Sequence, residues 1–140
     1  MVLLSFSVKE AELLAGTKVR TTRLYAPEKY RQWQSTIPPN ATKLLDYWWK
    51  SRTPNGYLMF ERPGADLYRL GFVYLNGRYW PFRERDSGLY TPMTVDEFEQ
   101  YVREEGFEDE SPLLMRFFEV HYAPLEGRVF QSIAFPRTVA

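Results

Sequence analysis

The sequence contains no cysteine and only one histidine among its 140 residues. The lack of cysteine excludes disulfide bonds, thiolate metal ligands and cysteine nucleophiles, and it is compatible with a reducing compartment. The net charge is zero, which excludes a uniformly basic nucleic-acid-binding protein. The apolar start of the chain, residues 1–7, is far too short for a signal sequence or a membrane span. We therefore expect a soluble, cytoplasmic protein.

Sequence motifs for metals and cofactors are also lacking. His121 has no second histidine near it, and its position on a predicted helix with an apolar stripe favours a structural role. The acidic run at residues 96–110 lacks a calcium-loop pattern and is typical of a solvated helix face. No glycine-rich phosphate loop and no Ser-His-Asp spacing is found. We expect no metal and no cofactor.

The residues that are present predict one folded domain spanning residues 1–140. The apolar share is 44% and the aromatic share 17%, which is ample for a core. The charges are distributed unevenly along the chain. Residues 1–52 carry nine Lys and Arg against four Asp and Glu, whereas residues 94–110 carry eight acids and one arginine. We expect a basic face beside an acidic one, and ordinary solvated surfaces would give the same counts.

Short strands alternate with a few short helices in the predicted secondary structure. Runs rich in β-branched and aromatic residues predict strands at residues 2–6, 17–25, 56–61, 67–75, 78–85 and 128–135. Residues 43–53 fit either a helix, by the spacing of their leucines and tryptophans, or a strand, which their Tyr and Trp content favours. Asn76-Gly77 predicts a tight hairpin, and Pro81 predicts an edge or a bulge in the strand that follows. We expect residues 26–40 to form a loop. The pattern indicates a small α+β domain.

Helix start and stop signals predict three helices. Ser7 and Glu10 form a possible capping box that opens a two-turn helix ending at Gly16. Thr94 and Glu97 form a second capping box, which begins a helix that ends at residue 106. Ser111-Pro112 begins the third, because proline is tolerated in the first turn.

The segment Gly16-Thr17-Lys18-Val19-Arg20-Thr21-Thr22-Arg23 has the highest density of potential binding groups. It places three cations and three hydroxyls directly after a glycine that can leave a helix in the left-handed conformation. Such a corner can offer donors to a phosphate or a carbonyl. A solvated edge strand paired with the acidic helix is the structural alternative.

This segment resembles the Gly-x-Lys-x-x-Thr-x-Arg signature of the ASCH family, within the PUA-like superfamily. Gly16, Lys18, Thr21 and Arg23 occupy its four fixed positions. Two further segments are similar to family landmarks: Glu105-Gly106-Phe107 near the end of a helix, and Arg52-Thr53-Pro54 after a strand. The resemblance spans nearly the whole chain, although the family's Gly-Asp step is replaced by Asn40-Ala41-Thr42.

The resemblance implies a small PUA-like β-barrel with two to three flanking short helices and a basic cleft that binds RNA, a nucleoside or a nucleotide. The ligand-binding residues implied are Gly16, Arg20, Arg23 and Arg52. A bacterial branch of the family hydrolyses N4-acetylcytidine, which implies an alternative function as an amidohydrolase or ribonuclease. Its catalytic residues would be Lys18, Thr21 and Glu105.

The chemistry of that alternative is sound, but it makes a geometric demand. A desolvated lysine can take the proton of a threonine hydroxyl, and a carboxylate can orient the lysine. In a regular strand, however, Lys18 and Thr21 face opposite sides, so the pair requires a bend after Gly16. Arg23 shares a face with Thr21. The pairs Trp48-Trp49 and Tyr79-Trp80 are candidates for base stacking or for the core, and an interaction module without chemistry is a third possibility.

Overall fold

The computed structural model describes residues 2–6, 9–86, 88–107 and 111–135. Within these ranges the helices are α1 (Glu10–Ala15), α2 (Pro27–Gln34), α3 (Val95–Glu104) and α4 (Ser111–Tyr122). The strands are β1 (Val2–Phe6), β2 (Arg20–Leu24), β3 (Leu45–Trp49), β4 (Tyr57–Arg62), β5 (Asp66–Leu75), β6 (Arg78–Glu84), β7 (Tyr90–Pro92) and β8 (Phe130–Ala134).

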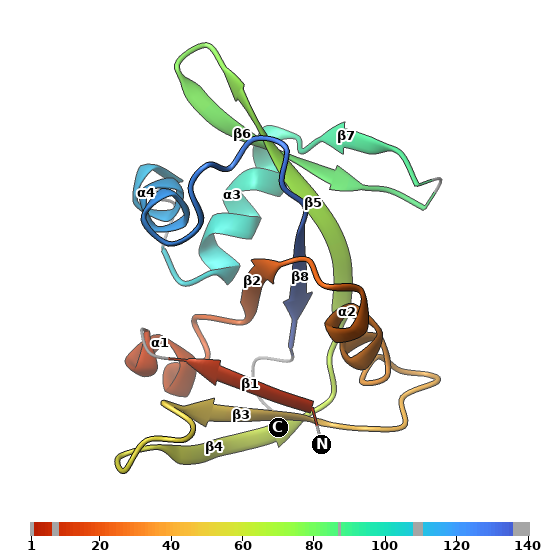
Figure 1. Cartoon of the computed structure of the whole chain (residues 1–140), viewed down its shortest axis with the longest axis vertical. Helices are drawn as coiled ribbons and strands as arrows, with labels where there is room; N and C mark the ends of the chain where they lie inside the picture. Colours follow the sequence, from red (N-terminus) through yellow and green to blue (C-terminus); the bar gives the residue numbers. More distant parts are fainter. Residues whose placement is uncertain (1, 7–8, 87, 108–110, 136–140) are drawn as a thin grey trace.

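The strands form two sheets, and Figure 1 shows them at opposite ends of the long axis. The smaller sheet has the order β1-β3-β4, with β1 and β3 parallel. The larger sheet has the order β2-β8-β5-β6-β7 and is antiparallel throughout. The α+β class is therefore confirmed. The expected barrel is not found as a closed cylinder, because the described strands divide into sheets of three and five.

Strand β8, the second strand in the order of the larger sheet, lies between two hydrophobic cores. Phe130 packs with α3 and α4 on one face of the large sheet, whereas Ile133 packs with the small sheet on the other. Successive strand residues point to opposite faces, so one short strand contributes to both cores. Leu114 of α4 and Leu45 of β3 are completely buried members of the first and second core. The result is a layered molecule in which β2 and β8 lie between the two cores.

Several elements follow the sequence prediction closely. The capping box at the start of α3 is present, with Glu97 N donating to Thr94 Oγ1 and Thr94 N donating to the Glu97 carboxylate. Asn76 and Gly77 have φ values of 50° and 83°, as a tight hairpin with positive φ at both turn residues requires. In β6 the residues that pair with β7 begin at Phe82, so Pro81 lies just outside this pairing. The other predicted capping box involves Ser7, which lies outside the described residues.

Two elements were not predicted. The segment expected as a loop contains α2, which begins at Pro27 and is held by Trp33, a buried residue of the second core. Tertiary burial of one large side chain thus favours a helix that the local sequence specifies weakly. Strand β7 is only three residues long and is defined by its pairing with β6. None of the helices in the described ranges is long and apolar enough to cross a lipid bilayer.

Candidate functional site

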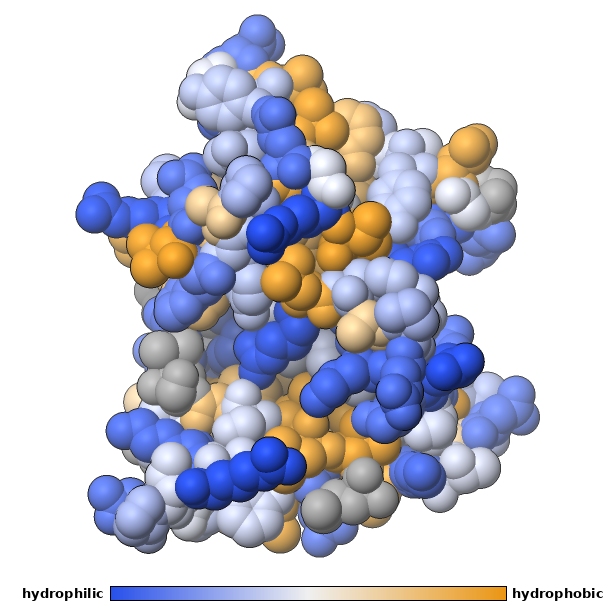
Figure 2. Space-filling model, in the orientation of Figure 1, coloured by the Kyte–Doolittle hydropathy of each residue, from blue (hydrophilic) through white to orange (hydrophobic). Residues whose placement is uncertain are grey.

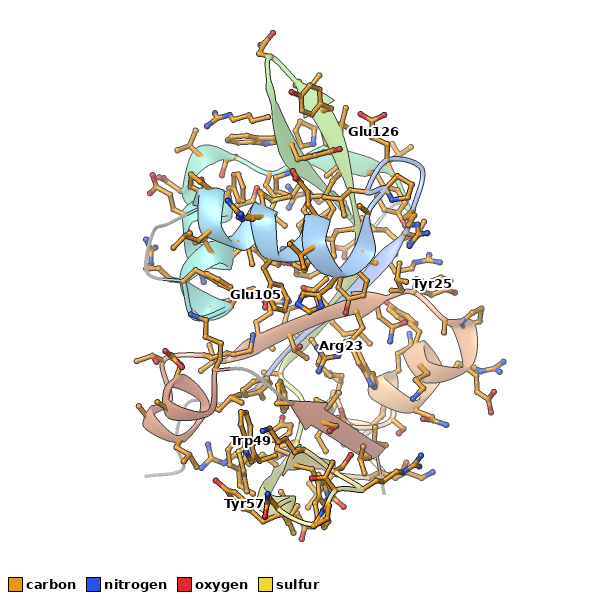
Figure 3. All side chains as sticks on the ribbon, turned by 60° about the vertical axis from the view of Figure 1, so that its left-hand side comes forward. Arg23, Tyr25, Trp49, Tyr57, Glu105 and Glu126 are labelled. Carbon is orange, nitrogen blue, oxygen red and sulfur yellow. The ribbon has the colours of Figure 1, made fainter. Side chains whose placement is uncertain are left out.

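Strand β2 separates the motif residues onto two faces. It pairs with β8 along its whole length without a register shift, so its side chains alternate regularly. Arg20 and Thr22 lie on the face covered by α3, whereas Thr21 and Arg23 lie on the face toward the small sheet. Figure 3 shows Glu105 and Arg23 on opposite sides of the β2 ribbon. The residues predicted to form one site therefore belong to two separate sites, one on each face of β2.

The first site is a buried network around Lys18 and Glu105. Lys18 Nζ donates to Glu105 Oε2 at 2.9 Å, to the Glu105 carbonyl at 3.1 Å and to the Arg20 carbonyl at 2.8 Å. Thr22 Oγ1 donates to Glu105 Oε1 at 2.6 Å and lies 2.6 Å from Tyr101 OH. The three ammonium donors of Lys18 and both carboxylate oxygens of Glu105 thus have protein partners.

Two glycines permit this approach of segments far apart in the sequence. Gly16 ends α1 with a φ of 78°, and Gly106 follows α3 with a φ of 93°. A Cβ at position 106 would lie 3.1 Å from Lys18 Cβ, tighter than most carbon contacts. Val19 N then donates to the Glu104 carbonyl at 2.7 Å. The end of α3 can therefore lie directly against the segment after α1.

Burial governs the electrostatics of the network. The side chains of Lys18 and Glu105 are only 7% and 5% exposed. Desolvation lowers the pKa of the Lys18 ammonium below its usual value of 10.5, although the Glu105 carboxylate opposes this by raising it. Desolvation, followed by the nearby Glu105 charge, raises the pKa of the Tyr101 hydroxyl well above its usual value. Tyr101 is therefore neutral. Because the Thr22 hydroxyl donates its one hydrogen to Glu105, the Tyr101 hydroxyl is the donor in its hydrogen bond with Thr22.

Arg20 is held by protein groups on all three of its nitrogens. Nε donates to Glu104 Oε1 at 2.8 Å, NH2 to Asp66 Oδ2 at 2.7 Å and NH1 to Ser132 Oγ at 3.0 Å. The Arg20 side chain is 4% exposed. These contacts give Arg20 a structural role in joining β2, β5, β8 and α3.

Thr21 does not join Lys18 and Glu105. It is buried opposite Ile133 of β8, on the face of β2 toward the small sheet. The bend after Gly16 that would bring Lys18 and Thr21 onto one face is not found. The hydroxyl that reaches the Lys18–Glu105 pair therefore belongs to Thr22. The alternation of side chains along a strand could have identified Thr22 from the sequence alone, because Lys18, Arg20 and Thr22 are spaced by two residues and so share one face.

The second site surrounds Arg23, which is half-buried between the two sheets. Its NH2 group donates to the Ser5 carbonyl of β1 at 2.8 Å, and its guanidinium lies 5.3 Å from the centroid of the Phe6 ring. No carboxylate within 4.0 Å neutralises Arg23 among the residues described here. Figure 2 shows a hollow with a hydrophilic floor across the middle of the molecule, between the parts that hold the two sheets.

A turn after β3 contacts Ser5, the same residue that Arg23 contacts. Ser51 N donates to Ser5 Oγ at 3.1 Å, so Ser5 contacts both the turn and Arg23. Lys50 and Arg52 are exposed and have φ values of 45° and 64°, which make this turn sharp. Arg52 and Arg23, predicted from the sequence as ligand-binding residues, therefore lie in segments that meet at Ser5. Gly16 is placed at the other end of β2, beside Lys18.

The described part of the chain contains no group of three or more His, Cys, Asp or Glu side chains arranged to hold a metal ion. Comparison with known proteins finds no matching family model, curated protein or solved structure. The chemistry of the two sites is therefore the basis for inferring a function.

Proposed function

We propose that the chain is a cytoplasmic ASCH-type domain, its two sheets forming an open PUA-like barrel, and that it binds RNA or a nucleotide at the surface around Arg23. The observation that carries this proposal is the contrast between the motif cations. Lys18 is neutralised by the buried Glu105 carboxylate and Arg20 by the partly exposed carboxylates of Glu104 and Asp66, whereas Arg23 has no carboxylate partner among the described residues. A half-buried guanidinium beside an aromatic ring suits a phosphate oxygen or a stacked base.

The neighbouring turn supports the same ligand class. Lys50 and Arg52 are exposed cations of the turn whose Ser51 contacts Ser5, the residue that Arg23 also contacts, and Lys50 lies 5.5 Å from the Trp49 ring centroid. Cations interleaved with aromatic side chains are the pattern that single-stranded nucleic acids favour. The Lys18–Glu105 network then holds β2 and α3 in place beneath the ligand.

The test is a titration of labelled single-stranded RNA at several salt concentrations. Each phosphate contact contributes about 0.7 to the slope of log affinity against log salt for single strands. We expect Arg23→Ala to weaken binding and to reduce that slope by about one contact. Arg31→Ala, which removes an exposed arginine on α2, is the matched control and should bind as the unaltered protein does. Absence of binding even at low salt would remove the proposal.

A second candidate function is the hydrolysis of an acetylated cytidine, as the bacterial ASCH branch performs. It is favoured by one observation: a threonine hydroxyl and a lysine with a lowered pKa share one buried carboxylate. The nucleophile in this arrangement would be Thr22 rather than Thr21. Release of acetate from N4-acetylcytidine that is lost in Thr22→Ala and kept in Thr21→Ala would support this function, and lack of any release would exclude it.

A further inference from the structure

An open groove of about 740 Å³ lies between α4 and the hairpin that joins β5 and β6. The ladder of this hairpin continues to the pair Leu75 and Arg78. Strand β8, however, pairs with β5 only as far as Leu70, and β7 pairs with β6 only from Phe82. The hairpin therefore projects beyond the sheet, at the upper end of Figure 1. The volume lies within the range of about 300 to 1,000 Å³ that binding clefts in proteins occupy.

One face of α4 forms the first wall of this hairpin–α4 groove. Its side chains recur every four positions along the helix, so they lie above one another. They include Pro112, Met115, Arg116, Glu119 and Val120. A different face of α4, which contains Leu114 and Phe118, packs into the first core. The groove face is therefore not the face that holds α4 on the protein.

Helix α4 carries more apolar surface than its contacts with the core use. Val120 is 73% exposed on the groove face, and Leu113 is 51% exposed outside the groove. The only acidic or basic side chains of residues 111–122, besides His121, are Arg116 and Glu119. A surface helix normally presents charged and polar residues to solvent, whereas a helix that is apolar on most sides is normally covered. We therefore expect a partner to cover the groove face.

The hairpin forms the second wall with aromatic side chains. Tyr74 and Tyr79 lie opposite each other in the β5–β6 ladder, and their ring centroids are 5.1 Å apart. Tyr74 is 52% exposed, whereas Phe98 and Met115, which also line the groove, are buried. Aromatic residues and methionine are enriched at protein–protein contacts, and exposed apolar patches with a polar rim mark such contacts. The groove is therefore suited to the apolar side chains of another protein.

Two arginines determine the charge that suits the partner. Arg78 lies on the hairpin wall and Arg116 on the helix wall, and both are exposed. Neither forms an ion pair with a carboxylate in the described part of the chain, and Glu119 is the one acid of the groove. A two-fold contact between two copies would bring four arginines together with two glutamates, so charge disfavours a second copy as the occupant. An acidic partner would instead be attracted.

We propose that the hairpin–α4 groove binds a helix of a partner protein, one that presents an apolar stripe to the groove and carries acidic residues beside that stripe. Amphipathic helices bind apolar grooves in this way. The walls consist of side chains, and a helix presents only side chains, whereas an extended segment would bring unpaired backbone groups into the groove. Acidic residues beside the stripe pair with Arg78 and Arg116. The groove does not include Arg23, so this inference is independent of the proposed function.

The experiment selects binders of the full chain from a displayed library of amphipathic helical peptides. The peptides have about 16 residues, enough for a helix to form, and the positions beside the apolar stripe vary among acidic, basic and neutral residues. We expect the enriched peptides to be acidic at these positions. Val120→Glu should weaken their binding about tenfold or more, because it places a like charge in the groove. The matched control is Leu113→Glu, the same change at an exposed apolar residue of α4 that does not line the groove.

A reversal of charge tests the contact with the arginines. Arg116→Glu should weaken the binding of an enriched acidic peptide and strengthen the binding of the same peptide with lysine at its acidic positions. Arg31→Glu, which reverses an exposed arginine of α2, should leave both peptides unaffected. Circular dichroism checks that every variant is folded.

Several outcomes overturn the inference. They are a selection that yields no binder, enrichment of basic or neutral peptides, and enriched peptides that bind Val120→Glu as tightly as they bind the unaltered protein. Sedimentation of the chain alone tests the other occupant, because a dimer that Val120→Glu dissociates would assign the groove to a second copy. Val120→Glu should bind RNA as the unaltered protein does, so failure of this inference would leave the proposed function unaffected.

Discussion

Lys18 and Glu105 form an ion pair that is nearly excluded from water, although 87 positions separate them in the sequence. Such a pair contributes little net stability, because the cost of removing both charges from water offsets their attraction. Its value lies in specificity: once one charge is buried, the other must be placed beside it. The pair therefore fixes the end of α3 against the segment that follows α1.

Removing one member of the pair should destabilise the protein strongly. We expect Glu105→Gln and Lys18→Met each to lower the free energy of unfolding by about 3 to 5 kcal/mol, since each leaves a buried group without its counter-charge. The double variant Lys18→Met/Glu105→Leu should lose clearly less than the sum of the two. Urea denaturation measures all three. The control Glu99→Gln, at an exposed position of α3, should change stability by at most about 0.5 kcal/mol.

Additive losses in that cycle would contradict a direct pairing of the two charges. Losses below about 1 kcal/mol in both single variants would indicate that water reaches the site, and the desolvation that lowers the pKa of Lys18 would then be absent.

At the scale of elements, α3 carries both the capping box and the carboxylates of the network. Its first turn is specified locally by Thr94 and Glu97, and Arg85 of the preceding segment adds two hydrogen bonds to the Glu97 carboxylate. These bonds from Arg85, and then the one from the backbone of Thr94, lower the pKa of Glu97 from 4.5 to about 2. The helix start is thus sensitive to acid.

This pKa shift predicts how stability depends on pH. The folded state favours the ionised Glu97, so the stabilisation is complete above pH 4.5 and is lost as the pH falls toward about 2. We expect Glu97→Gln to be less stable than the unaltered protein at neutral pH, and the difference to shrink through this range. Thermal unfolding at several pH values measures it, and Glu99→Gln should show no comparable trend. A difference that is independent of pH would assign the effect to packing.

At the scale of the whole molecule, β8 lies between two cores that are built mostly from different elements, although Leu67 of β5 also packs against the second. The first core contains α3, α4 and β5, and the second contains the small sheet with α1 and α2. Because one strand of five residues belongs to both, neither core can lose it and remain intact. The molecule should therefore unfold as one cooperative unit.

Substitutions in the two cores test this cooperativity. Leu114→Ala in the first core and Leu45→Ala in the second should each lower stability by about 2 to 5 kcal/mol, since both side chains are fully buried. Circular dichroism and tryptophan fluorescence should report one shared transition in both variants. Two separate transitions in either variant would show that the cores unfold independently.

The elements that are stabilised by contacts between residues close in sequence could be predicted from the local sequence. The capping box of α3, the proline at the start of α4 and the turn at Asn76-Gly77 are satisfied within a few residues, so their sequence signals are sufficient. Helix α2 has only weak local signals, and its anchor Trp33 is buried by residues distant in sequence. Strand β7 likewise exists through its pairing with β6.

The residues of the two sites can likewise be divided into what the sequence identified and what only the tertiary structure decided. The sequence alone identified Lys18, Glu105 and Arg23 as residues of interest. The alternation of side chains along a strand also predicts that Thr21 and Thr22 lie on opposite faces of β2. Only the tertiary structure decided which cations are neutralised, because Arg20 meets Asp66 and Glu104 through chain segments that no local pattern connects. Burial and long-range charge pairing depend on how distant segments pack, and the sequence specifies this packing collectively rather than residue by residue.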